Sequence, residues 1–191
     1  MKMSSIDRRA FLKRAGLGSI ALGSASVFAE AFAVPALAAG EATFHFAAIS
    51  RGNTIGNVSH AVNMSGFGRI NSAEVVGGGY FQHYDLASSP PRTIFGAGGW
   101  KAKRLVSFDP IGTWGVITAG ILVIEIHLVR EIPSRAVVPA TLKVICNVGS
   151  GGFDTGQPEG FTLTVPGAAF SPFVPGVAGI TAFSTVVADR D

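Results

Sequence analysis

Short runs of β-branched and aromatic residues recur along most of the chain, and they constrain its fold more than any other feature. In each run apolar residues occupy alternate positions and glycine, proline, asparagine or aspartate bounds the run, which is the pattern of a β-strand. The runs that we interpret as strands span 42–50, 57–65, 73–84, 100–109, 114–130, 140–147, 160–166 and 179–187. We find no helical period of ten or more residues after Ala39. These patterns predict an all-β domain of about eight antiparallel strands, either a β-sandwich, which we favour, or a closed β-barrel.

The strongest strand signal is the segment G-I-L-V-I-E-I-H-L-V-R at 120–130. Alternation places four apolar side chains on one face of this strand, namely Leu122, Ile124, Ile126 and Leu128. The opposite face is mixed and includes Glu125 and His127. The apolar face must therefore be core, while the mixed face is typical of a central strand that a loop partly covers.

Segments rich in glycine and proline separate or interrupt these strands. Turns are predicted at 51–54, 65–68, 88–91, 109–112 and 149–152. The glycines at 77–79 fall inside a predicted strand, where they indicate a bulge or the close approach of another segment. Segment 166–179 is predicted to be a loop or an edge covering, because proline cannot donate to a strand ladder. Its Phe170 and Phe173 either form an exposed contact loop or, as we favour, fold onto the core.

The first 38 residues have the layout of a cleaved export signal. The head of this segment is basic and contains Lys2, Arg8, Arg9, Lys13 and Arg14. A diluted apolar middle follows, and the small residues Ala36 and Ala38 predict cleavage after Ala38. The apolar middle is shorter than the roughly 20 residues that span a bilayer, so no permanent membrane span is expected. The mature chain, 39–191, is long enough to bury its own core and is expected to be one domain.

The segment D-R-R-A-F-L-K at 7–13 resembles the twin-arginine (Tat) export signal, in which two arginines and a variable residue precede Phe-Leu-Lys. The residues that match this pattern are Arg8, Arg9, Phe11, Leu12 and Lys13. Asp7 stands where serine or threonine is more usual. By this resemblance the Tat export machinery is a partner, and it carries the folded chain from a prokaryotic cytoplasm to the periplasm or the extracellular space. The mature chain is similar to other Tat-exported bacterial proteins in composition alone, which transfers no residue role.

The basic excess of the chain belongs to its leader. The formal net charge is +3, yet five of the 15 lysines and arginines and two of the 12 acidic residues precede Ala39. Ten of each sign remain, so the mature chain is formally neutral. A neutral domain lacks the clustered cations that phosphate contacts need, which argues against a nucleic-acid partner.

Two single residues have a structural interpretation that we favour over a chemical one. Cys146 is the sole cysteine, and alternation within 140–147 predicts a buried core residue, with an intermolecular disulfide or a reactive thiol as the alternatives. F-D-T-G at 153–156 resembles the aspartic-peptidase signature, but it occurs once and Gln157-Pro158 follows it. A polar turn at Asp154 is therefore the interpretation that we favour.

Histidines and carboxylates two residues apart on a strand share a face, so they can offer two ligands to one metal ion. Two such pairs occur, His83 with Asp85 and Glu125 with His127, and His45 is a further candidate. We find no close H-x-H, H-E-x-x-H or C-x-x-C pattern in the chain. Surface histidines in contact with solvent are therefore the default interpretation.

Two functions remain for the exported domain. The one we favour is a structural or binding role without catalysis, with contacts to envelope components, other proteins or a second copy through a sheet edge or the loop with Phe170 and Phe173. The alternative is a metal- or small-ligand-binding barrel, with or without enzymatic activity, that uses the histidine and carboxylate pairs. No cofactor is predicted, since nucleophile-elbow, phosphate-loop and dinucleotide motifs do not occur.

Overall fold

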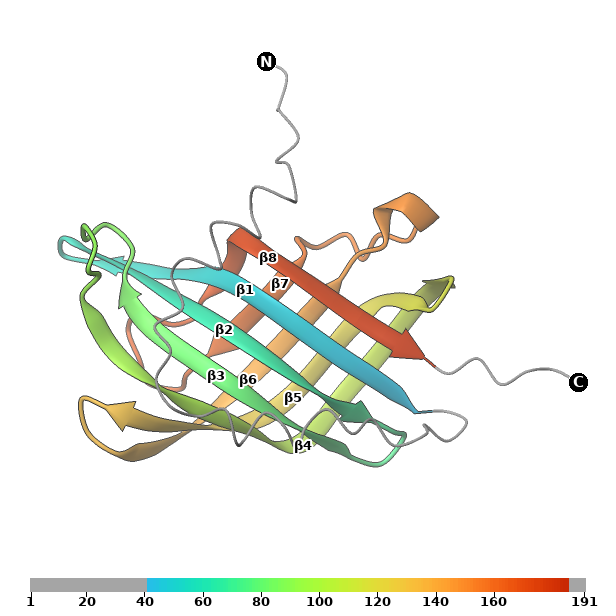
Figure 1. Cartoon of the computed structure of the whole chain (residues 1–191), viewed down its shortest axis with the longest axis horizontal. Helices are drawn as coiled ribbons and strands as arrows, with labels where there is room; N and C mark the ends of the chain where they lie inside the picture. Colours follow the sequence, from blue (N-terminus) through green and yellow to red (C-terminus); the bar gives the residue numbers. More distant parts are fainter. Residues whose placement is uncertain (1–40, 186–191) are drawn as a thin grey trace, which may run out of the picture. The chain divides into compact units, whose positions relative to one another are not determined.

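The computed structural model describes residues 41–185, which form an all-β structure (Figure 1). Its strands are β1 (Ala42–Ile55), β2 (Val58–Ile70), β3 (Val75–Asp85), β4 (Ile94–Trp114), β5 (Ile117–Ile132), β6 (Ala136–Cys146), β7 (Gly160–Thr164) and β8 (Val174–Thr185). A short 3₁₀ turn, η2 (Gly149–Gly151), precedes β7, and residues 41–185 contain no α-helix. Within this range we find no helix that is long and apolar enough to cross a membrane.

The predicted export signal lies outside the described residues. This holds for the residues that match the twin-arginine pattern, Arg8, Arg9, Phe11, Leu12 and Lys13, and for the predicted cleavage residues Ala36 and Ala38. The described residues belong to one compact unit of the chain.

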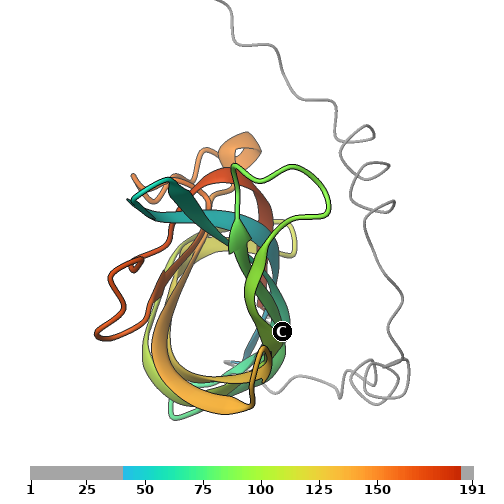
Figure 2. The same ribbon diagram turned by 90° about the vertical axis from the view of Figure 1, so that its left-hand side faces the viewer.

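The strands form one antiparallel sheet in which β1 to β7 pair in the order of the chain. β8 returns to pair with β1, and it also pairs with β5 at Ile117 and Thr118. The pairings β1–β2–β3–β4–β5–β8–β1 thus close a ring, while β6 and β7 continue from β5. Figure 2 looks along this ring from the end where the β1–β2 and β5–β6 turns lie. The expected all-β fold of about eight antiparallel strands is confirmed.

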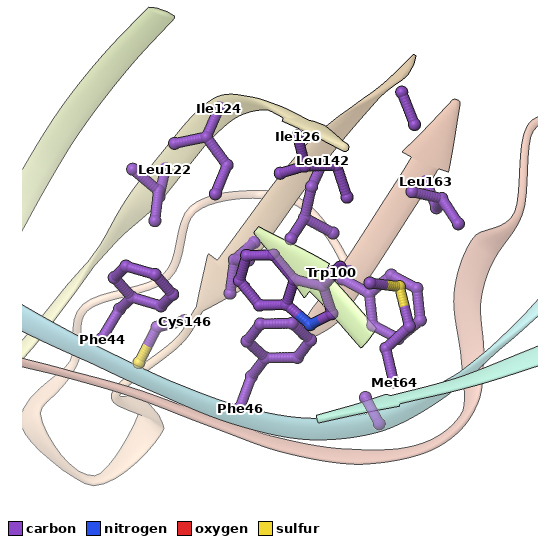
Figure 3. Close-up of a cluster of buried hydrophobic side chains, with 14 of the residues drawn as sticks. Phe44, Phe46, Met64, Trp100, Leu122, Ile124, Ile126, Leu142, Cys146 and Leu163 are labelled. Carbon is purple, nitrogen blue, oxygen red and sulfur yellow. The ribbon is translucent and has the colours of Figure 1, made fainter. Parts of the chain in front are cut away.

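The inner face of the sheet encloses the hydrophobic core. On β5 the buried side chains are those that alternation predicts, Leu122, Ile124, Ile126 and Leu128. The register pairs Ile124 with Leu142 of β6, so the buried face continues onto the neighbouring strand. Large side chains from β1, β2 and β4 meet these residues across the core, among them Phe44, Phe46, Met64 and Trp100 (Figure 3). Residues from β1, β2 and β4 and residues from β5 and β6 therefore build one core.

Glycines in β2 and β3 make room for Trp100, the largest fully buried side chain. A Cβ atom at Gly66 or Gly79 would overlap the Trp100 indole, whose Nε1 donates a hydrogen bond to the Ser65 carbonyl at 2.9 Å. The close approach predicted for the glycines of β3 is therefore confirmed. The turn predicted at 65–68 is wrong, because Gly66 and Gly68 lie within β2, beside the rings of Trp100 and Phe44.

Two other predicted turns are also wrong. Residues 51–54 and 109–112 lie inside β1 and β4, each at a register shift of the ladder. Pro110 has no N–H to donate, and the shift between Pro110 and Gly112 lets β4 continue past it. The turns predicted at 88–91 and 149–152 are confirmed.

Candidate functional site

A cavity of about 320 Å³ lies at the end of the sheet where β2, β4, β6 and β8 begin. This end is on the left in Figure 1 and faces the viewer in Figure 2. The side chains that line the cavity are apolar except for His60, His83 and Arg130. Aromatic rings make up much of the wall and come from Phe81, Phe95, Phe170 and Phe173. The cavity is therefore an apolar chamber with three polar side chains.

Two histidines on neighbouring strands meet in this wall. The register pairs His60 with Asp85 and Val62 with His83, which places both imidazoles on the same face of the sheet. Nδ1 of His60 and Nε2 of His83 lie 2.8 Å apart. At this distance one neutral ring donates its N–H to the other. Within residues 41–185 the second nitrogen of each ring has no hydrogen-bond partner, and none of the unpartnered polar side-chain atoms is fully buried, so these nitrogens keep some accessible surface.

Phenylalanine rings surround the histidine pair. The Phe95 centroid lies 5.1 Å from that of His60 and 5.2 Å from that of His83. Phe170 lies 5.3 Å and 4.6 Å from the same two rings, and Phe173 lies 5.2 Å from His83. Aromatic rings at these separations are in favourable contact. The imidazoles are thus held in an aromatic environment.

The segment between β7 and β8 directs Phe170 and Phe173 inward. Asn53 of β1 donates two side-chain hydrogen bonds to carbonyls of this segment, at 3.0 and 2.9 Å. The backbones of Leu163 and Phe173 also exchange two hydrogen bonds. Phe173 is buried and Phe170 is half-buried. The two rings therefore do not form an exposed contact loop, and they fold onto the core, which is the alternative that we favoured.

The apolar surroundings keep the histidine pair neutral. Burial lowers the pKa of His83 from 6.5 to about 4, and a charge on His60 lowers it in the same direction. Burial also lowers the pKa of His60, whereas the nearby Asp85 carboxylate raises it. Since desolvation disfavours the imidazolium, both rings act at neutral pH as hydrogen-bond donors and acceptors and not as cations.

The residues considered for a metal site do not gather at one place. His83 lines the cavity, whereas Oδ1 of its neighbour Asp85 accepts backbone hydrogen bonds from Ser59 and Ala87 at 3.1 and 3.0 Å. Glu125 lies on the outer side of β5, where Oε2 accepts a hydrogen bond from Nε of Arg104 at 3.0 Å. Asp85 therefore stabilises local backbone, and Glu125 takes part in a surface ion pair.

The other two metal candidates also lie outside the cavity. His127 alternates with the buried Ile126 and Leu128 and so shares the outer face of β5 with Glu125. His45 is exposed on β1, where its ring stacks on that of Phe67 with 6.3 Å between the ring centroids. In the described range no three histidine, cysteine or acidic side chains are grouped so that they could hold a metal ion. The hydrogen-bond partner of His83 is His60, and not Asp85, with which it was expected to form a metal-binding pair.

The two single residues singled out in the sequence have structural roles. Cys146 is buried, and its Sγ lies 3.5 Å from the carbonyl oxygen of Thr181. Burial raises the pKa of this thiol, which suits a core residue more than a nucleophile. Oδ1 of Asp154 accepts a hydrogen bond from the backbone N–H of Gly156 at 2.8 Å, which is the polar turn that we favoured.

Comparisons with known proteins give no family for this chain. No family model, no curated protein and no solved structure matches it. The functional interpretation therefore follows from the geometry of the cavity.

Sequence reasoning did not identify His60 or Arg130 as site residues. His60 is 23 positions from His83, and no short motif connects them. A signal was nevertheless present, because two consecutive predicted strands, 57–65 and 73–84, carry one histidine each. Only the register of that hairpin decides whether the two imidazoles meet.

Proposed function

We propose that this protein binds a small, largely apolar ligand in the cavity beside the His60–His83 pair. One observation carries the proposal: an apolar cavity of about 320 Å³ contains a few convergent polar atoms. Ligand sites in proteins are typically concave, mostly apolar and about 300–1,000 Å³ in volume, with a few polar groups that orient the ligand. The proposed role is a binding role without catalysis.

The size and the walls of the cavity define the ligand class. An apolar cavity of about 150 Å³ accommodates a single benzene ring. A cavity of about 320 Å³ is twice as large and suits a molecule with about two fused rings. The rings of Phe95 and Phe170 favour a planar, aromatic ligand, because offset and edge-to-face contacts add to the burial of apolar area.

The proposal is tested with three naphthalene probes that differ in one substituent: 2-methylnaphthalene, 2-naphthalenemethanol and 2-naphthoate. Ligand-observed NMR with the full chain measures whether each probe binds saturably. Two variants with the same substitution separate the cavity from the rest of the surface. Val138→Phe places a ring in the cavity, whereas Val137→Phe places it on the outer face, where Val137 is 59 % exposed.

We expect saturable binding of at least one probe, loss of that binding in Val138→Phe and retention of it in Val137→Phe. Thermal unfolding of both variants shows whether each of them folds. Absence of saturable binding for all three probes, or equal binding by two folded variants, would overturn the proposed function.

We also propose that the protein acts after export, in the periplasm or the extracellular space. The proposal is supported by the resemblance of 7–13 to the twin-arginine signal. Changing Arg8 and Arg9 together to lysine keeps the charge but removes the arginine pair. We expect this variant to remain in the cytoplasmic fraction with its leader attached, whereas the unchanged chain leaves the cytoplasm and is shortened after Ala38. Equal export of both chains would contradict this route.

A further inference from the structure

We propose that the ligand of this cavity is an anion, with an aromatic body and a carboxylate head group that Arg130 binds. This inference rests on the proposed ligand-binding function and goes further by assigning the head group and its partner. Of the described residues that line the cavity, Arg130 is the one with a formal charge at neutral pH, and no acidic side chain lines it. Arg130 therefore supplies the positive charge in the lining of the cavity.

The position of Arg130 follows from the alternation of β5. Leu128 is buried, so Arg130, two residues later, shares its inward face at the mouth of the cavity. The stem of Arg130 extends over β4 at Gly96, where an added Cβ would lie 3.4 Å from Cδ of Arg130. The stem of Arg130 therefore passes within van der Waals reach of β4 at Gly96.

The guanidinium of Arg130 is held in place on one side and free on the other. Its Nε donates to the Ser134 carbonyl at 3.0 Å, and its Nη2 donates to Oγ of Ser134 at 3.2 Å. A guanidinium has five N–H donors, so three remain on the Nη1 and Nη2 side. The ion pair observed within residues 41–185 is that of Arg104 with Glu125, which leaves Arg130 without a carboxylate partner in this range.

The free side of the guanidinium matches a carboxylate. Two parallel N–H groups at that side can donate to both carboxylate oxygens, and such bidentate pairs are stronger than neutral hydrogen bonds. The neutral His60–His83 pair adds no competing charge. An alcohol of the same shape has no charge and a single oxygen, so it would gain neither the ion pair nor the second hydrogen bond. The structure therefore favours the acid over the alcohol.

Isothermal titration calorimetry with the full chain compares 2-naphthoate with 2-naphthalenemethanol. We expect the acid to bind roughly tenfold to a hundredfold more tightly than the alcohol, as hydrogen bonds to a charged group imply. Arg130→Gln removes the charge and should abolish this preference. Arg130→Lys keeps the charge without the two parallel donors and should restore part of the preference. Arg104→Gln is the matched control, because Arg104 lies on the outer face, and it should behave as the unchanged chain does.

The possible results are distinguishable. If the alcohol binds and the acid binds no more tightly, or if Arg130→Gln keeps the preference for the acid, the inference about the anion is overturned and the ligand-binding function stands. If none of the naphthalene probes binds, the proposed function itself fails. Thermal unfolding of Arg130→Gln shows whether this variant folds.

Discussion

Acidification should destabilise the protein through His83, and the structure gives both the sign and the size of the effect. Burial lowers the pKa of His83 to about 4 in the folded chain, whereas the ordinary value of 6.5 applies when the chain is unfolded. The unfolded chain therefore binds more protons between these two values. The stabilisation is fully present above pH 6.5 and is lost progressively as the pH falls toward 4.

The gap between 6.5 and about 4 corresponds to about 3.4 kcal/mol if the whole difference is expressed as stability. His83 is only half-buried, so water screens part of this effect, and we expect about 1–2 kcal/mol. Carboxylates elsewhere also titrate in this range. The effect of His83 is therefore measured as the difference in pH dependence between the unchanged chain and a variant without His83, and not as the total pH dependence of stability.

The assay is urea unfolding of the full chain at pH 7.5, 6.5, 5.5 and 4.5, for the unchanged chain, His83→Gln and His45→Gln. Glutamine does not titrate in this range. Between pH 7.5 and 4.5 we expect the free energy of unfolding to fall by about 1–2 kcal/mol less in His83→Gln than in the unchanged chain. His45 is exposed on the outer face, so His45→Gln should keep the full decrease. Identical pH profiles for the unchanged chain and His83→Gln would refute the neutral, desolvated histidine pair.

Three further predictions concern the framework around the cavity. Gly79→Ala places a Cβ in overlap with the Ser65 carbonyl oxygen and 2.7 Å from Nε1 of Trp100, and it should lower the free energy of unfolding by about 1–3 kcal/mol. A Cβ at Gly99 lies 3.5 Å from its nearest neighbour, so Gly99→Ala should be tolerated. Urea unfolding compares the two variants, and equal stability would contradict the packing. Asp85→Ala removes the acceptor for two backbone N–H groups and should cost roughly 1–2 kcal/mol by the same assay, while an unchanged stability would show that water replaces the carboxylate. Cys146 is 1 % exposed and should react with a thiol reagent only after unfolding, so rapid labelling of the native chain would show that this thiol is accessible.

The fold was more predictable from the sequence than the site. Alternation identified the inward face of β5. Leu122, Ile124, Ile126 and Leu128 are buried as expected, because a period of two is a local property that survives in any sheet. Glycine was a weaker guide. Gly66 and Gly68 were interpreted as turn residues, yet they lie within β2, since the rings of Trp100 and Phe44 occupy the space that side chains there would need.

The candidate site was predictable only in part. His83, Phe170 and Phe173 were singled out, but as members of two separate features, a metal pair and the loop at 166–179 whose rings we expected to fold onto the core. The other polar residues of the cavity, His60 and Arg130, come from β2 and β5, and no short motif connects them with His83. A site assembled from several strands depends on strand register, and a shift of one residue would turn each of these side chains to the other face.

The sequence by itself determined the all-β fold class and the side of each main strand that faces the core, because strand propensity and alternation act over a few residues. The predicted export signal also rests on sequence alone. The tertiary structure decided which strands pair, how β8 and β5 complete the ring, and which side chains meet at its end. These features depend on contacts between residues far apart in the chain, such as the 2.8 Å contact between His60 and His83. For that reason His60 and His83, which the sequence presented as surface groups, form in the folded chain a polar pair in the wall of an apolar cavity.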